Sequence, residues 1–417
     1  MFATMIEYEH SVLSNGLTVV VHPDPTSSVA VVNVAYKVGS RDETSDKTGF
    51  AHLFEHLMFS GSINIPSYDE PLQQAGGENN AFTTPDYTNY YLTVPAENIE
   101  TGLWLESDRM LGLAFNEKGL EVQRKVVIEE FKQRYLNQPY GDVWHRLRAL
   151  TYDEHSYKWP TIGKNIKQIE DAKMDDVRAF FDTYYVPNNA ILVLAGNITT
   201  ERGFELAKKW FGDIPKGKDI KRNSIVEPKQ DGKRFLNVES NVPVNAFYKT
   251  YHMPGRDVID YYTADLLSDI LGRGKSSILY EALVEKKPVF TELAAYVLGS
   301  ADPGLLVISG KLSTDTKFEN AEIEIDKLIT QFLKAGVDAL ALEKAKNQAL
   351  ATHAFGDIDV LDRAMNLAYG YILNDLDRTN KELKIMENVT ENDINKMANS
   401  ILIESNASTL YYNAKST

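Results

Sequence analysis

Residues 49–59 read Gly49-Phe-Ala-His52-Leu-Phe-Glu55-His56-Leu-Met-Phe59, an apolar run with helical spacing. Histidines four residues apart lie on one face of a helix, so their imidazole nitrogens can bind one zinc ion together. Glu55 lies on a neighbouring part of the helix surface. From there its carboxylate can reach a water molecule bound to the metal, although Glu55 itself is not a ligand. This order inverts the His-Glu-x-x-His motif and is itself a signature of metallopeptidases. The alternative is a helix with two partly buried histidines and a chance glutamate.

A catalytic zinc site also needs a third protein ligand and an open position for water. The candidate stretch is a polar helical segment that contains an adjacent pair of glutamates. In a helix, Glu130 lies on the face of Val126 and Val127, two residues that should be buried. Gln123 lies on the same face, and Glu129 points away from it. The periodicity therefore favours Glu130 over Glu129 as the ligand, with a solvated acidic helix face as the alternative.

Four stretches of the first half are rich in β-branched residues and are predicted as strands, with helical patterns between them. The predicted strands are 17–22, 29–38, 89–94 and 190–195, and the predicted helices are 47–60, 97–150, 174–184 and 200–211.

The second half repeats this arrangement. Residues 388–397 read as a capped helix that precedes the strand 407–412, just as the helix in 170–179 precedes the strand 190–195. We therefore expect an α+β fold with two related α/β-sandwich domains, each with a mixed, largely antiparallel sheet covered by helices. The predicted strands of this half are 244–251, 292–298, 304–310 and 407–412, and its predicted helices are 260–271, 276–286, 316–335 and 340–375.

A basic, polar segment at 215–224 has no apolar period and is bracketed by proline and glycine, which is typical of a linker. The alternative is a surface loop within one domain. The expected organisation is a zinc-binding catalytic domain at 1–215, a linker at 216–232, and a second, homologous domain without the metal motif at 233–417.

The composition of the 417 residues excludes several classes of function. Acidic residues outnumber basic ones, 59 to 44, which argues against nucleic acid as the main partner, because phosphate binding needs a basic face. The chain has no cysteine, so thiolate metal sites and cysteine nucleophiles are excluded. No apolar run reaches the roughly 18 residues that predict a membrane span. The start, Met1–Tyr8, lacks the basic and apolar regions of a signal peptide, and the sequence leaves the compartment open between cytoplasm and periplasm.

The His52-Leu-Phe-Glu55-His56 segment and the later Val127-Ile-Glu-Glu130 resemble the metal-binding sequences of the pitrilysin/insulinase family of zinc peptidases, the inverted zincins. A third element, residues 76–90, resembles the family's stretch with Asn-Ala-x-Thr followed by Thr-x-Tyr. The order of these elements agrees over nearly the whole chain. The length and the apparent duplication resemble the small bacterial and mitochondrial-processing members.

The resemblance implies one Zn²⁺ per chain, held by His52, His56 and Glu130. Glu55 would be the general base for the water that attacks the scissile carbonyl. The implied activity is that of an endopeptidase acting on unfolded peptides or presequence-like segments, with the two halves forming a clam-like half chamber. The rival class is a non-catalytic structural or peptide-binding subunit, although such relatives typically have broken ligand sets.

The resemblance also places Asn80 and Ala81 on an edge strand that binds the substrate backbone. This role has a physical basis, because an extended peptide gains main-chain hydrogen bonds at a sheet edge whatever its sequence. The alternative for Asn79 and Asn80 is a turn.

Two departures from the family pattern bear on activity. In the family, a glutamate often stands seven residues before the third ligand, and here that position is Gln123. The amide of Gln123 can form a hydrogen bond to a ligand but supplies no negative charge. Many members carry an arginine and a tyrosine seven apart in the second domain, where this chain has Val284 and Thr291. Some members are heterodimers in which a related chain supplies such groups, so the resemblance implies a dimer with a partner of similar size. The alternatives are that Tyr296 or Arg273 serves instead, or that the enzyme is weak.

Overall fold

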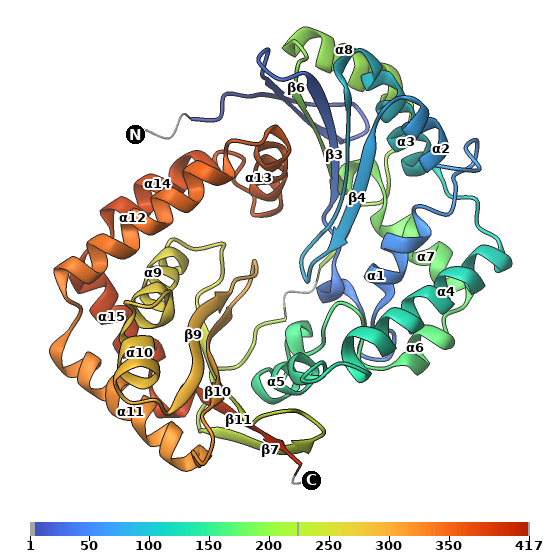
Figure 1. The fold of residues 1–417 in the computed structure, drawn as a ribbon. Helices are drawn as coiled ribbons and strands as arrows, with labels where there is room; N and C mark the ends of the chain where they lie inside the picture. Colours follow the sequence, from blue (N-terminus) through green and yellow to red (C-terminus); the bar gives the residue numbers. More distant parts are fainter. Residues whose placement is uncertain (1–4, 223–224, 416–417) are drawn as a thin grey trace. The chain divides into compact units, whose positions relative to one another are not determined.

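The computed structural model describes residues 5–222 and 225–415, which form two compact units, each with one helix-covered sheet (Figure 1). Unit 1 comprises Met1–Leu136, Trp159–Ile225 and Ala354–Asn380, and unit 2 comprises Asn137–Lys158, Val226–His353 and Lys381–Thr417. The predicted α+β class is confirmed. Residues 1–4, part of the stretch considered for a signal peptide, and 223–224, in the predicted linker, lie outside the described residues.

Unit 1 contains a six-stranded sheet in the order β1-β2-β6-β3-β5-β4. Strands β2 and β6 run parallel, and the other neighbours are antiparallel. All four strands predicted in the first half are present, with ends shifted by at most two residues. The strands are β1 (Glu9–Val12), β2 (Thr18–Pro23), β3 (Val29–Tyr36), β4 (Glu78–Thr83), β5 (Thr88–Pro95) and β6 (Ala190–Gly196).

The two edge strands, β1 and β4, were not predicted from local pattern. The β4 sequence Glu-Asn-Asn-Ala-Phe-Thr has low strand propensity and no clean alternation. It is a strand because it pairs with β5, with Ala81 opposite Tyr90. An edge strand is held by one neighbour through backbone hydrogen bonds, so its side chains need not be apolar.

Helices cover both faces of the first sheet. On one face, α1, α3 and α8 pack into the main core of unit 1. On the other face, α13, from far along the chain, packs Ala364 and Leu367 into a second core with Val31 and Val193. The helices of this unit are α1 (Phe50–Leu57), α2 (Asp69–Gln74), α3 (Ile99–Leu111), α4 (Glu117–Phe131), α6 (Ile166–Glu170), α7 (Met174–Tyr184), α8 (Thr200–Phe211) and α13 (Val360–Ile372).

Unit 2 contains a five-stranded sheet in the order β7-β11-β8-β10-β9, with β7 and β11 parallel. The strands are β7 (Arg234–Ser240), β8 (Ala246–Met253), β9 (Phe290–Leu298), β10 (Gly304–Leu312) and β11 (Ala407–Ala414). Helices α9, α11 and α15 supply the core on one face. On the other face, α5 packs Val143 and Leu147 against Leu410. The remaining helices are α5 (Val143–Thr151), α9 (Asp260–Gly272), α10 (Ile278–Tyr280), α11 (Phe318–Ala335), α12 (Ala339–Gly356), α14 (Arg378–Asn388) and α15 (Glu391–Ile401).

The two sheets share one topology. Read from β2, the first sheet has the same spatial order of strands as the second, and the parallel pair stands at the same place. Each sheet is covered on one face by a helix from the other half of the sequence: α13 for the first and α5 for the second. The contiguous boundaries 1–215, 216–232 and 233–417 remain a prediction.

Two long predicted helices are divided in the structure. The zone 97–150 forms α3, α4 and α5, and the zone 340–375 forms α12 and α13. Side-chain caps explain where new helices begin: Asn116 accepts a hydrogen bond from Gly119 N before α4, and Asp359 accepts one from Leu361 N before α13. Among the described residues, no helix combines the length and the apolar composition needed to cross a membrane.

Candidate metal centre

Three side chains from two helices of unit 1 converge on one point: His52 and His56 from α1 and Glu130 from α4. Glu130 Oε2 lies 3.6 Å from His52 Nε2 and 3.3 Å from His56 Nε2. Ligand atoms of all three residues lie within 4.8 Å of one another, and no second such group of His, Asp or Glu occurs in the part of the chain that the structure describes. The structure thus brings together the three residues predicted as ligands.

Helix α1 presents both imidazoles on one side because they are one turn apart. Its other side is anchored in the core by Leu53 and Phe54, which are fully buried. The ring centroids of His52 and His56 lie 4.9 Å apart, with an interplanar angle of 79°. The packing of α1 therefore fixes the orientation from which both rings face Glu130.

Helix α4 turns Glu130 inward and Glu129 outward, as the periodicity predicted. The side chain of Glu130 is 18% exposed and that of Glu129 is 60% exposed. Val127 is fully buried, but Val126 is 44% exposed, so the expectation that both valines would be buried is wrong. Val127 packs into the core together with Leu120 and Phe131, and Val126 lies outside this buried stripe of the helix.

The electrostatic setting of the three residues suits metal binding. Burial lowers the pKa of His52 to about 4, although the neighbouring Glu130 carboxylate opposes this effect. The hydrogen bond from His56 lowers the pKa of Glu130, and the charge of Arg134 acts in the same direction. Arg134 Nη1 lies 3.0 Å from Glu130 Oε1, a contact that was not predicted. Near neutral pH, His52 is neutral and Glu130 is ionised, which are the forms that bind metals.

The donor set fits zinc. Two imidazole nitrogens and one carboxylate oxygen are a known catalytic ligand set that leaves a fourth position open. In a tetrahedral site with ligands about 2.0–2.1 Å from the ion, ligand atoms lie about 3.3 Å apart. The separations of 3.3 and 3.6 Å from Glu130 Oε2 to the two imidazoles are close to that value.

Glu55, on the same helix, is held by a strand rather than by the ligands. Its Oε2 accepts a hydrogen bond of 2.5 Å from Thr83 Oγ1 at the end of β4. Burial raises the pKa of the Glu55 carboxyl, and the bond from Thr83 lowers it in part. Sequence reasoning assigned no role to Thr83, although it belongs to the Asn-Ala-x-Thr stretch.

Asn80 and Ala81 lie in β4, at the outer edge of the first sheet, and not in a turn. The N–H group of Ala81 donates to its neighbour's side-chain oxygen, Asn80 Oδ1, at 2.8 Å. This N–H therefore takes no part in pairing with β5 and faces the open edge. Helix α1 contacts β4, so the edge and Glu55 belong to one local assembly.

Four residues considered for the second domain lie in unit 2. Val284 lies in a π-helical segment, Glu281–Lys286, packed against the core, and Thr291 is an exposed residue of β9. Arg273 Nη1 lies 3.0 Å from Asp269, and Tyr296 lies in β9. In unit 1, Gln123 donates to Ser60 Oγ at 2.9 Å rather than to a ligand side chain.

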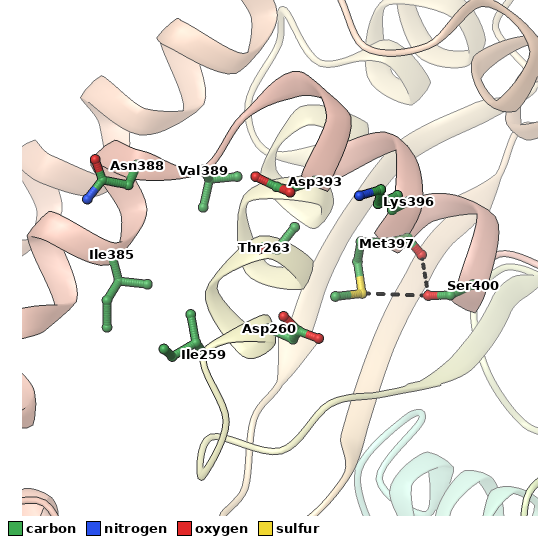
Figure 2. Close-up of a pocket in the computed structure, with 10 residues that line it drawn as sticks. All are labelled: Ile259, Asp260, Thr263, Ile385, Asn388, Val389, Asp393, Lys396, Met397 and Ser400. Atoms are coloured by element: carbon green, nitrogen blue, oxygen red, sulfur yellow. Dashed lines mark hydrogen bonds between the residues drawn. The ribbon is translucent and has the colours of Figure 1, made fainter.

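A cavity of about 640 Å³ lies elsewhere, among α9, α14 and α15 of unit 2 (Figure 2). Apolar side chains such as Ile385 and Met397 line it together with Asp260 and Lys396. Its lining includes none of the histidines of the metal cluster, so it is separate from that chemistry.

Comparisons of sequence place the chain among known peptidases. Residues 18–164 match the family model described as "Insulinase (Peptidase family M16)", and residues 171–349 match the one described as "Peptidase M16 inactive domain". The zinc protease PqqE of Helicobacter pylori is 33% identical over 346 residues, which cover 82% of this chain and 78% of that protein. The mitochondrial-processing peptidase subunit beta of Saccharomyces cerevisiae is 24% identical over 360 residues, covering 82% and 77%.

Solved structures agree with this placement. The crystal structure of a protease from Helicobacter pylori superimposes with a TM-score of 0.93 at 30% identity, covering 98% of this chain and all of that one. The crystal structure of pitrilysin has a TM-score of 0.81 at 20% identity and matches 98% of this chain with 45% of its own length, which shows a shared fold.

Proposed function

This chain belongs to the insulinase (M16) family of peptidases, and on that premise we propose that it is a zinc-dependent endopeptidase acting on unfolded peptides or presequence-like segments. The observation that carries the proposal is the convergence of His52, His56 and Glu130 within 4.8 Å in unit 1. Relatives named zinc proteases support a metallopeptidase at the level of the family. The proposed organisation is a metal-binding half at 1–215 and a second half at 233–417, joined by 216–232.

In this proposal, His52, His56 and Glu130 hold one Zn²⁺. When bound, zinc acts as a Lewis acid toward a carbonyl and lowers the pKa of water. Glu55 is the general base: its carboxylate accepts a proton from the attacking water and then gives it to the leaving amine. Burial supports the second step, because a carboxyl with a raised pKa holds the proton long enough to deliver it.

The peptide backbone binds along β4. The outward N–H of Ala81 is a ready donor to a substrate carbonyl once the Asn80 amide moves aside. The Asn80 amide then offers its own donor and acceptor to the same peptide. Main-chain pairing of this kind favours extended, unfolded segments over folded proteins, because a folded substrate has its backbone groups already paired.

A partner chain completes the enzyme in this proposal. Val284 and Thr291 stand where related enzymes carry an arginine and a tyrosine, so a second chain of similar size would supply donors for the developing oxyanion. A chain that cleaves peptides at full rate as a monomer would contradict this part alone.

The test of the function is Glu55→Gln. The amide keeps the shape but cannot take the proton, so zinc content should stay at one ion per chain while peptide hydrolysis falls by at least about 100-fold. Glu70→Gln, an exposed glutamate on α2, is the matched control and should retain wild-type activity.

Activity at the wild-type rate in Glu55→Gln would remove the assigned base. A wild-type chain that binds zinc but cleaves no unstructured peptide, alone or with a related chain, would favour the alternative of a peptide-binding subunit.

A further inference from the structure

Glu43 lies at the start of helix α1 with its carboxylate surrounded by nitrogen donors. Its Oε1 accepts the N–H of Ala51 at 2.9 Å, and its Oε2 accepts the N–H of Gly49 at 3.0 Å. The indole N–H of Trp159 also donates to Oε2, at 3.0 Å. Glu43 is 7% exposed and Trp159 is 5% exposed. These three donors offset only part of the cost of burying the carboxyl group, because burial still raises the pKa of Glu43 to about 8. Removal of the side chain would leave the buried N–H groups of Gly49 and Ala51 without this acceptor.

Helix α1 is short, and its N-terminus has no side-chain cap of its own. It has eight residues, and helices of that length are unstable in water without tertiary contacts. Its N-cap residue is Gly49, at φ 87°, which has no side chain to accept from the N–H groups of the first turn. Glu43 supplies that acceptor from outside the helix, and its acidic group lies at the positive end of the helix dipole.

The loop that carries Trp159 is itself tightly joined to the start of α1. Trp159 donates a second bond to Ser40 O at 3.1 Å. Thr48 Oγ1 accepts a hydrogen bond from the backbone N–H of Lys164 at 2.8 Å. A Cβ atom on Gly49 would stand 2.6 Å from Ile162 O, so this approach requires glycine. Glu43 thus connects α1 to the Trp159 loop within unit 1.

We propose that Glu43 is a positioning residue of the metal centre, which fixes the start of α1 and thereby the places of its ligands relative to Glu130. The inference rests on the proposed zinc site. Ala51 donates its backbone N–H to Glu43 and directly precedes His52. Functional groups must be held within about 0.5 Å of the productive geometry. Because α1 carries two ligands and the base, a small shift of its axis moves all three together.

This role predicts a specific pattern of losses. In Glu43→Ala, the zinc dissociation constant rises about 10–100-fold, the range found when groups that support metal ligands are removed. The kcat falls as well, because α1 also carries Glu55, whereas KM changes less than about two-fold, because β4 keeps its pairing with β5. Glu43→Gln retains one acceptor and gives a smaller loss. Trp159→Phe removes one of three donors and also gives a smaller loss in the same direction.

The experiment uses the full-length chain. Zinc affinity is measured on metal-free protein by competition with a chromophoric chelator, and Co²⁺ is added separately so that its absorption spectrum reports the coordination geometry. Circular dichroism establishes that each variant is folded. Glu201→Ala is the matched control, because Glu201 is an exposed glutamate in the first turn of α8. A changed Co²⁺ spectrum in Glu43→Ala, with the wild-type spectrum in Glu201→Ala, supports the positioning role.

Wild-type zinc affinity and kcat in a folded Glu43→Ala variant overturn the inference. If that variant does not fold, Glu43→Gln takes its place, and zinc affinity within about two-fold of wild type overturns the inference equally. Failure of the proposed function is distinguishable, since then the wild-type chain itself binds no zinc or cleaves no peptide.

Discussion

Thr83 donates a hydrogen bond of 2.5 Å to the carboxylate of Glu55, and this bond joins the edge strand β4 to helix α1. The proposed base and the proposed peptide-binding edge are therefore joined directly by a side-chain hydrogen bond. A peptide that pairs with β4 would lie at a defined distance from Glu55, because Thr83 belongs to the same strand as Asn80 and Ala81. Orientation of this kind is a large source of rate enhancement in enzymes.

Replacing Thr83 by valine tests this link. Thr83→Val removes the donor to the Glu55 carboxylate, and the pKa of Glu55, already raised by burial, rises further. Since the base must be ionised to accept a proton, the acid limb of the pH profile of kcat/KM should move to higher pH. The expected result is a larger loss of activity at pH 6 than at pH 8. A uniform loss at all pH values would mean that Thr83 acts only through packing.

The adjacent glutamates of α4 provide a matched pair. Glu130→Gln replaces an inward carboxylate near both histidines, so the zinc dissociation constant should rise by at least about 100-fold, with a parallel loss of activity. Glu129→Gln changes an exposed side chain whose partner is Lys132 and should leave zinc affinity within about two-fold. Equal effects of the two substitutions, measured by chelator competition, would contradict the assignment of the third ligand.

Glu322 in unit 2 predicts an acid-dependent loss of stability. Burial alone would raise its pKa, but hydrogen bonds from Tyr411 and Lys233 and the charge of Lys249 outweigh it and lower the pKa from 4.5 to about 2. A carboxyl with a lowered pKa stabilises the folded state above pH 4.5, and this stabilisation is lost as the pH falls toward 2. The shift corresponds to roughly 3 kcal/mol.

Urea unfolding of Glu322→Gln between pH 7 and pH 2 measures this contribution. The variant should be less stable than wild type at pH 7, and the difference should shrink as the pH falls through 4.5. Glu319→Gln, an exposed position in the first turn of α11, should follow the wild-type curve. A difference between Glu322→Gln and wild type that is independent of pH would show that the charge of Glu322 is not responsible.

The packing of α13 on the first sheet predicts that the stability of unit 1 depends on a helix far along the chain. Leu367 is fully buried against the sheet of unit 1, so Leu367→Ala should lower the free energy of unfolding by about 2–5 kcal/mol. Phe355, in the same C-terminal segment of unit 1, is 74% exposed. Phe355→Ala should therefore change the free energy of unfolding by less than about 0.5 kcal/mol. Similar costs for both substitutions would contradict the packing of α13.

Local pattern in the chain was enough to predict the interior strands and to select His52, His56 and Glu130 as candidate ligands. Strands β2, β3 and β6 are buried on both faces, so their runs of valine, isoleucine and leucine identify them without reference to any neighbour. The spacing of His52 and His56 follows from helical geometry, and the outward turn of Glu129 follows from the same periodicity. The exposure of Val126 and the division of the predicted helix 97–150 did not follow from periodicity, because it does not show how wide the covered part of a helix face is or where a helix ends.

Contacts between distant segments decided the rest. Strand β4 exists because β5 pairs with it, α13 covers a sheet formed by residues more than a hundred positions away, and the buried Glu43 side chain accepts a hydrogen bond from Trp159 in a distant loop. None of these features has a local signature, since a hydrogen bond or an apolar contact depends on where both partners lie in space. The amino-acid order therefore specifies which residues can bind a metal, and the folded chain specifies what holds them in place.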